Sequence, residues 1–247
     1  MPGRPARYQN ARLDPALAVL EGFHALKHAL RFGAEVVEAA SADLAAILAL
    51  ADVLAPDLAL LLPRLLDEVG EEEFARLTPS APPTPVVALA RRPAADPDAL
   101  LAGPHPGAVV LLDHPNHLGN LGAVIRVAAA AGAAGVLTTG ERDPWHPTAL
   151  RGSAGLHFAL PVARLPGPLP GGRPLVALDP KGISLWEADL PPRAVLAFGG
   201  ERRGLGPAIL AAADLRVAIP MEAGVSSLNL ATAVAVVLFE ARRRGGA

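Results

Sequence analysis

Apolar residues recur at intervals of three and four shortly after the start of the chain, behind Asp14 and Pro15. Asp and Pro are residue types preferred at the first positions of a helix. The spacing is typical of one face of an amphipathic helix. It therefore predicts a single helix that carries Leu17, Leu20, Phe23, Leu26 and Leu30.

Short valine-rich runs and longer apolar segments follow. Residues 35–40 and 85–90 have the length and the β-branched content of strands. Residues 42–50 and 57–66 have the periodicity of helices. Together these elements predict a small α/β unit.

A proline-rich stretch separates two patterns of organisation. Between Arg91 and Pro106 the chain carries four prolines and a glycine, a composition typical of a domain boundary. We therefore expect a small α/β domain over residues 1–95, a linker over 96–106 and a second domain over 107–247.

In the second domain, buried strands alternate with helices. A continuous apolar run at 107–113, a helical stretch at 121–131 and a strand beginning at Gly135 form a βαβ unit, which predicts a parallel sheet. Strands are expected further along at 158–163, 174–178 and 194–198, and helices at 206–212 and 227–243.

Composition excludes several classes of protein. The hydrophobic content of 51% excludes a disordered chain, and the absence of cysteine excludes disulfides and thiolate chemistry. The longest apolar run, Leu228 to Phe239, is shorter than the roughly 20 residues that a membrane span needs. The N-terminus lacks the apolar core of a secretory signal. We expect a cytoplasmic protein with no membrane span.

The formal net charge of −2 is low for a protein that binds nucleic acid. Residues 1–105 carry 9 Lys+Arg against 14 Asp+Glu, whereas residues 106–247 carry 13 against 10. Arg4, Arg7 and Arg12 precede the first acidic residue. This arginine-bearing terminus is expected either to contact phosphate or to be frayed and solvated.

Three turn-forming segments follow predicted strands, where open α/β sheets bind ligands. The first has Asn120 at a helix start and Arg126 six residues later. The amide and the guanidinium can both address one anionic group there. The alternative is an asparagine cap beside a solvated arginine.

The second segment, Leu196 to Gly206, is dense in glycine, which suggests a backbone that approaches a ligand closely. It matches neither the Walker A pattern nor the dinucleotide fingerprint, and a plain strand-turn-helix connection is the alternative. The third segment runs from Val217 into the last helix. Its serines are ordinary capping residues. Asn229 is expected inside that helix, where a ligand could satisfy its amide.

In this order, the three segments resemble the motifs of the SpoU (TrmH-like) family of SPOUT-superfamily RNA 2′-O-ribose methyltransferases. The resemblance covers about residues 107–247, through N-x-G-x-x-x-R, G-x-E-x-x-G and I-P-M…S-L-N. The run after the last asparagine departs from the usual Val-Ser-Val-Ala, at packing positions. The matched residues are Asn120, Gly122, Arg126, Gly199, Glu201, Gly204, Ile219, Pro220, Met221, Ser227, Leu228 and Asn229.

The resemblance implies an α/β SPOUT domain whose C-terminal segment forms a deep trefoil knot, although topology rules make knots rare. Residues 1–95 look similar to the small RNA-binding domain, related to a kink-turn-binding ribosomal protein, that precedes the methylase domain in many relatives. Since relatives are dimers whose sites combine residues of both chains, a homodimer is expected.

The resemblance also implies S-adenosylmethionine as the cofactor, held largely by backbone groups. Arg126 would lie beside the ribose hydroxyl and a phosphate, and because an arginine retains its proton it would stabilise charge and would not act as the base. Asn120, Glu201, Ser227 and Asn229 would position the reacting groups. The expected cofactor contacts are Gly199, Ile219 and Leu228, with their neighbours Phe198, Gly200 and Met221.

The sequence therefore predicts methylation of a ribose 2′-hydroxyl in structured RNA, with ribosomal RNA favoured over transfer RNA by the N-terminal domain. Two alternatives stay open: a catalytically inactive RNA-binding protein of the same fold, and an α/β nucleotide-binding enzyme acting on a small molecule. No metal site is expected, because His114 and His117 beside Asp113 have no convincing third ligand.

Overall fold

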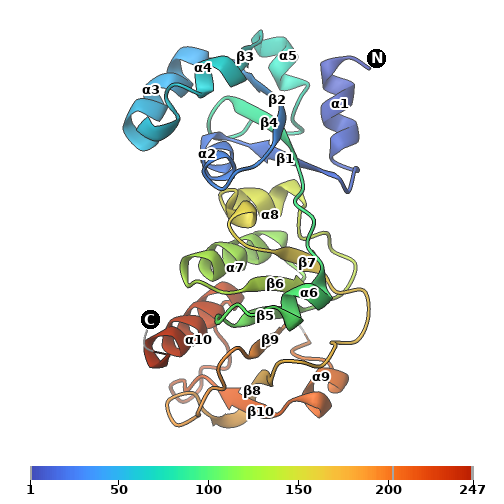
Figure 1. Ribbon diagram of the computed structural model, residues 1–247, viewed down its shortest axis with the longest axis vertical. Helices are drawn as coiled ribbons and strands as arrows, with labels where there is room; N and C mark the ends of the chain where they lie inside the picture. Colours follow the sequence, from blue (N-terminus) through green and yellow to red (C-terminus); the bar gives the residue numbers. More distant parts are fainter. Residues whose placement is uncertain (1, 202, 246–247) are drawn as a thin grey trace. The chain divides into compact units, whose positions relative to one another are not determined.

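The computed structural model describes residues 2–201 and 203–245 (Figure 1). The chain packs into two compact units. Unit 1 contains Met1–Ala94 and Trp145–Ala159, and unit 2 contains Ala95–Pro144 and Leu160–Ala247. A single boundary near residue 95 therefore does not separate the units, because 145–159 belongs with the N-terminal residues.

Unit 1 is built on a four-stranded sheet in the order β1-β4-β2-β3. The strands are β1 (Leu17–Glu21), β2 (Val36–Ser41), β3 (Asp67–Glu68) and β4 (Val86–Arg91). All neighbours are antiparallel except β2 and β3. The helices of this unit are α1 (Arg4–Ala11), α2 (Phe23–Arg31), α3 (Leu44–Leu54), η1 (Pro56–Leu58), α4 (Leu62–Leu65), α5 (Glu71–Ala75), α8 (Pro147–Gly152) and η2 (Leu156–Phe158).

The single helix predicted from Leu17 to Leu30 is wrong in its first part. Residues 17–21 form β1, which pairs along its whole length with β4, and the helix begins only at Phe23. Gly22, with φ of 92°, makes the turn between the two elements. Pairing with a strand some 70 residues away overrides the local helical spacing.

The other predictions for this region are mostly confirmed. Strands β2 and β4 and helix α3 occupy the expected positions. The helix expected over 57–66 is wrong, because two short helices, η1 and α4, take its place with a turn between them.

The N-terminal arginines belong to a helical segment held by ion pairs, so the expectation of a frayed tail is wrong. They lie on and next to α1, whose Tyr8 is fully buried. Arg4 Nε and Arg7 Nε donate to the two carboxylate oxygens of Glu38 at 2.7 and 2.8 Å. Arg12 Nη2 donates to Glu21 at 2.7 Å. The hydrogen bond from Arg7, together with that from Arg4, outweighs partial burial and lowers the pKa of Glu38.

Specific contacts attach residues 145–159 to the rest of unit 1. Arg151 Nη1 donates to Glu21 Oε2 at 3.0 Å, and the ring nitrogen Nδ1 of His28 lies 2.7 Å from the carbonyl of Ala154. Gly155 has φ of 79°, and a Cβ there would collide with the backbone of Ala25. These contacts explain why this segment groups with residues that precede it by more than 100 positions.

Unit 2 contains a six-stranded sheet in the order β10-β8-β9-β5-β6-β7, in which every neighbouring pair is parallel. This confirms the predicted α/β fold with a parallel sheet. The strands are β5 (Val109–Asp113), β6 (Gly135–Thr138), β7 (Val162–Arg164), β8 (Leu175–Ser184), β9 (Val195–Gly199) and β10 (Leu215–Ala218).

Helices cover both faces of this sheet, as its uniformly apolar strands require. Figure 1 shows α7 and α10 packed side by side on one face, with α6 and α9 on the other. Every residue of β5, in the middle of the sheet, is buried. The bounds are α6 (Pro97–Ala102), α7 (Leu118–Ala130), α9 (Pro207–Ala212) and α10 (Leu230–Arg244).

Three details of unit 2 differ from the sequence predictions. The expected linker contains α6, whose Leu101 is 2% exposed and packs in the core. Strand β7 starts later than residue 158, because 156–158 forms η2. Strand β8 continues well past residue 178. Within residues 2–201 and 203–245, no helix combines the length and the apolar character that a bilayer crossing requires.

Candidate functional site

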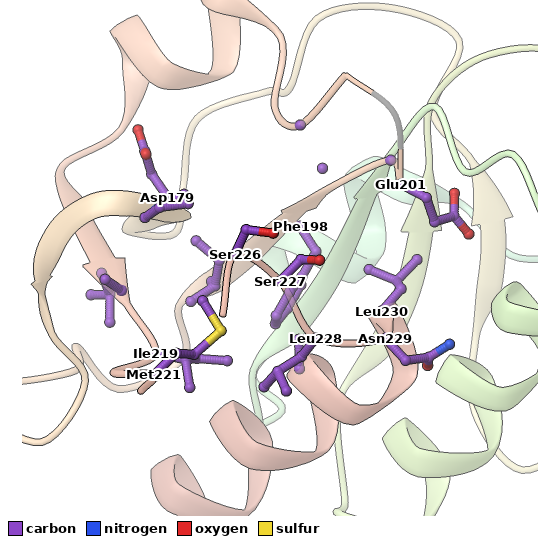
Figure 2. Close-up of a pocket in the computed structure, with 18 of the residues that line it drawn as sticks. Asp179, Phe198, Glu201, Ile219, Met221, Ser226, Ser227, Leu228, Asn229 and Leu230 are labelled. Carbon is purple, nitrogen blue, oxygen red and sulfur yellow. The ribbon is translucent and has the colours of Figure 1, made fainter. Parts of the chain in front are cut away.

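A pocket of about 370 Å³ opens in unit 2, at the carboxyl ends of β9 and β10 (Figure 2). It brings together ten of the eleven residues that the sequence predicts for the catalytic and cofactor sites. Four are the polar residues Asn120, Glu201, Ser227 and Asn229. The other six are the expected cofactor contacts Phe198, Gly199, Gly200, Ile219, Met221 and Leu228.

The loop after β9 folds back on itself, and this explains its glycines. Gly200 and Gly204 pair across the loop as an isolated β-bridge. A Cβ at Gly199 would collide with the backbone of Gly204, and a Cβ at Gly200 would lie 2.5 Å from the carbonyl oxygen of His114. Gly204 has φ of 65°, which favours glycine. The glycines are required by the chain's own close packing, in addition to lining the pocket.

Asp113, at the end of β5, fixes this loop to the sheet. Its carboxylate accepts a hydrogen bond from the backbone N–H of Gly206 at 2.7 Å and another from the hydroxyl of Thr139 at 2.6 Å. The side chain is almost fully buried. Asp113 is thus engaged in a structural role beside His114, and the described residues contain no group of three or more potential metal ligands.

A continuous chain of hydrogen bonds links the three segments. Asn120 Nδ2 donates to Glu201 Oε1 at 2.8 Å, and Asn229 Nδ2 donates to Asn120 Oδ1 at 3.2 Å. The N–H of Ala231 then donates to Asn229 Oδ1 at 2.9 Å. The second oxygen of Glu201 accepts the backbone N–H of Asn116 at 3.2 Å. Residues separated by more than 100 positions are therefore held as one polar unit.

The charge on Glu201 determines which groups donate and which accept along this series of hydrogen bonds. Burial favours the neutral acid, but the hydrogen bond from Asn120 and those from backbone N–H groups outweigh it and lower the pKa of Glu201. An ionised carboxylate can only accept hydrogen bonds, so Asn120 must present its NH₂ group to Glu201. The amide oxygen of Asn120 then faces Asn229, whose own oxygen faces the start of α10. A single ionised group thus sets the orientation of two amides.

Asn229 does not lie inside the last helix, as the sequence suggested. It is the N-cap of α10, with extended backbone angles, and its side chain accepts from the second residue of the helix. Its amide partners are therefore protein groups. Figure 2 shows Ser226 and Ser227 between Asp179 on one side of the pocket and Glu201 and Asn229 on the other.

Arg126 is the one predicted site residue that does not line the pocket. It lies about 9 Å further along α7 than Asn120 and roughly 120° around the helix axis. Its side chain is exposed and forms no hydrogen bond or ion pair with any residue in the described part of the chain. Within one chain, the side chains of Arg126 and Asn120 therefore leave α7 in different directions.

One wall of the pocket was not predicted from the sequence. Leu178, Asp179 and Pro180, in the middle of β8, contribute to the lining. The signal was an acidic residue directly after the predicted strand at 174–178, the same position that the other loops occupy relative to their strands. Because Asp179 belongs to none of the recognised motifs, it was not singled out.

Comparison with known proteins points to one family. Residues 107–239 match the model of the SpoU rRNA Methylase family. The chain is 36% identical, over 74% of its length and 66% of the relative's, to the 23S rRNA (uridine(2479)-2′-O)-methyltransferase of Streptomyces viridochromogenes. It is 30% identical, over 70% of its length and 71% of the relative's, to the 23S rRNA (guanosine(2553)-2′-O)-methyltransferase of Bacillus subtilis.

The fold agrees with a solved structure over nearly the whole chain. The SpoU methyltransferase AviRb from Streptomyces viridochromogenes, in complex with the cofactor AdoMet, superposes with a TM-score of 0.80 and 27% identity. This match covers 99% of the present chain and 98% of the other. Several further curated relatives, from Synechocystis and mycobacteria, are matched over only 52% to 55% of their length.

Proposed function

Because the chain belongs to the SpoU rRNA methylase family, we propose that it transfers a methyl group from S-adenosylmethionine (AdoMet) to a ribose 2′-hydroxyl of structured RNA. The observation that carries this proposal is the convergence of three distant segments on one pocket, joined through Glu201, Asn120 and Asn229. Ribosomal RNA is favoured over transfer RNA, because two relatives are named as 23S rRNA methyltransferases. Such a substrate implies a cytoplasmic location.

The lining of the pocket fits AdoMet better than a phosphate-bearing cofactor. Its walls include Phe198, Val217 and Ile219, and no lysine or arginine is among the described residues that line it. ATP or NAD would bring phosphates, which are normally bound by cations or a glycine-rich helix start. This argues against the alternative of a nucleotide-binding enzyme acting on a small molecule.

AdoMet supplies a methyl group already activated by its sulfonium, which a ribose 2′-oxygen can displace in line, so the reaction calls for no metal. The chain's own residues must align the hydroxyl. Glu201 holds the amides of Asn120 and Asn229 in one orientation at the rim of the pocket, and Ser227 adds a hydroxyl beside them. Alignment of reactants can contribute roughly 7 to 11 kcal/mol in favourable cases. The retained polar network also argues against an inactive RNA-binding protein.

We further propose that Arg126 serves the pocket of a second copy in a homodimer. Its exposed side chain forms no hydrogen bond or ion pair with the described residues of its own chain. In the second copy it would stabilise the developing oxyanion and hold an adjacent phosphate. A guanidinium keeps its proton at any physiological pH, so it would not act as the base. A fully active monomer in solution would contradict this assignment.

Two finer features of the fold belong to the proposal. The C-terminal segment is proposed to form the trefoil knot of the family. Supporting this, the chain leaves β10 at the sheet edge and returns to pack α10 against α7, where Arg242 donates to the carbonyl of Ala130. Unit 1 is proposed to bind RNA in the manner of a kink-turn-binding domain, supported by its small mixed sheet covered by helices.

The proposal is tested with the purified chain, methyl-labelled AdoMet and ribosomal RNA, followed by mapping of 2′-O-methyl positions. One dominant ribose position should be labelled, and transfer RNA should be a poor substrate. Calorimetry should detect binding of AdoMet but not of ATP or NAD. Binding of ATP or NAD in preference to AdoMet would favour a small-molecule enzyme, and AdoMet binding without transfer to any RNA would favour an inactive relative.

A further inference from the structure

The ionisable side chains that the structure describes in the pocket lining are all of one sign. Among the described residues that line it, only Asp179 and Glu201 can carry a charge, and both are acidic. Figure 2 shows them on opposite sides of the pocket. A pocket lined in this way has a negative potential, which favours a cationic ligand.

The two carboxylates differ in the partners of their oxygen atoms. Both oxygens of Glu201 accept hydrogen bonds from Asn120 and Asn116. In Asp179, Oδ1 accepts the backbone N–H of Lys181 at 2.9 Å, whereas Oδ2 has, among the residues that the structure describes, only the guanidinium of Arg216 at 3.9 Å, beyond hydrogen-bond distance. Oδ2 of Asp179 therefore accepts no hydrogen bond from the described residues and can face a bound ligand, whereas both oxygens of Glu201 are engaged.

Arg216 neutralises Asp179 only weakly. Its side chain is 47% exposed, so water screens the pair, and its Nη2 donates to the carbonyl of Leu210 at 2.7 Å. The side chain of Asp179 is only 14% exposed. Bulk water therefore screens the charge of Asp179 only weakly towards the pocket.

We propose that Asp179 makes the pocket distinguish the cationic methyl donor from the neutral product. This rests on the proposed function. AdoMet carries one positive charge more than S-adenosylhomocysteine, and the two molecules are otherwise nearly the same in shape. A weakly neutralised carboxylate in the lining therefore stabilises the donor selectively and lets the product leave.

The same charge strengthens binding of the donor but does not accelerate transfer. The sulfonium loses its positive charge as the methyl group leaves, so Asp179 stabilises the bound donor more than the transition state. Removing the charge should weaken donor binding without lowering kcat. Asp179 is a specificity-determining residue in this account, and Asn120 and Glu201 keep the positioning role.

The test is calorimetric titration of the full chain with AdoMet and with S-adenosylhomocysteine. For Asp179→Asn, the Kd of AdoMet should rise on the order of tenfold, because one partly screened charge is lost from the pocket lining. The Kd of S-adenosylhomocysteine should stay within about twofold. Asp179→Glu should retain the selectivity. Glu222→Gln removes an exposed acid that does not line the pocket, and it should change neither Kd.

A second variant, which should strengthen AdoMet binding, makes the test independent of structural damage at Asp179. Arg216→Gln removes the weak counter-charge, so it should tighten AdoMet by about twofold to threefold without affecting the product. The idea is wrong if Asp179→Asn leaves the ratio of the two Kd values unchanged, or if Arg216→Gln weakens both ligands equally. A wild-type chain that binds neither ligand would overturn the proposed function itself, which is a distinguishable outcome.

Discussion

In unit 1, arginines are paired with carboxylates of the same unit, whereas in unit 2 the polar residues of three loops bind one another around an open pocket. Arg4 and Arg7 share Glu38, and Arg12 and Arg151 share Glu21. In unit 2, Arg126 has no partner in the described part of its own chain. Several acidic residues of 1–105 are thus engaged in ion pairs within unit 1.

The comparison shows that the position of an arginine in the sequence does not reveal its role. An N-terminal cluster of arginines resembles a phosphate-binding tail, yet its guanidiniums are held by carboxylates more than 30 residues away or, for Arg12, by a buried one nearby. Arg126, in the middle of a helix, resembles a solvated surface residue, yet it has no partner among the described residues of its own chain and is available for a substrate or a partner chain. Substitutions can separate these two classes.

The largest effect is expected at Arg126. Arg126→Ala should lower kcat for methyl transfer by roughly 100-fold or more, equivalent to about 2.7 kcal/mol of transition-state stabilisation, because no other group replaces its charge. The Kd of AdoMet should not change, since Arg126 does not line the pocket. Arg126→Lys should recover only part of the activity. Single-turnover rates measure the effect, and activity within about threefold of wild type would refute the catalytic role.

A smaller effect is expected where the hydrogen-bond chain is broken. Asn120→Asp would place a second carboxylate against Glu201, at the position where the amide now donates at 2.8 Å. The resulting repulsion should lower kcat about 10-fold to 100-fold and disturb the orientation of Asn229. Asn116→Ala is the matched control, because Asn116 gives Glu201 only its backbone N–H. Equal losses of kcat for both variants would show that the hydrogen bond from Asn120 to Glu201 is unimportant for transfer.

In unit 1, the substitution is expected to change the stability of the fold and not the affinity for RNA. Arg12→Gln removes a charge from beside Glu21, whose side chain is 3% exposed. It should lower the free energy of unfolding by about 2 kcal/mol. RNA affinity should stay within about twofold. The exposed Arg64 serves as the control, since Arg64→Gln should leave stability unchanged. A loss of RNA affinity with unchanged stability would instead identify Arg12 as a phosphate contact.

The smallest effect is expected in the pH dependence of unit 1. Arg7 and Arg4 lower the pKa of Glu38 in the folded state. The stability contributed by this group is therefore complete above the ordinary pKa of a glutamate and is lost as the pH falls towards the lower, folded value. Glu38→Gln should flatten the acid limb of the stability curve and leave its neutral part parallel to wild type. An unchanged acid limb in chemical denaturation would exclude Glu38 as a source.

Local patterns in the sequence predicted unit 2 better than unit 1. The strands and helices from Val109 to Thr138 follow from continuous apolar runs, because a parallel sheet buries both faces of its strands. In unit 1, β1 has helical spacing by coincidence, and only its pairing with β4 makes it a strand. The grouping of 145–159 with unit 1 likewise depends on contacts, such as Arg151 with Glu21, that no local pattern contains.

The site was predictable as a set of residues but not as a geometry. The motifs identified Asn120, Glu201 and Asn229, yet their hydrogen bonds span 81 and 109 positions and cannot be derived from spacing. The sequence also placed Asn229 inside a helix that in fact begins after it. Asp179 was missed because a carboxylate that acts through its charge needs no surrounding motif.

A crystal structure of the chain grown with AdoMet tests the central claim most directly. The account predicts the donor in the pocket between β8, β9 and the start of α10, in contact with the backbone near Gly199, Ile219 and Leu228. Electron density for the donor at any other place, or its absence from this pocket at saturating concentration, would contradict the account.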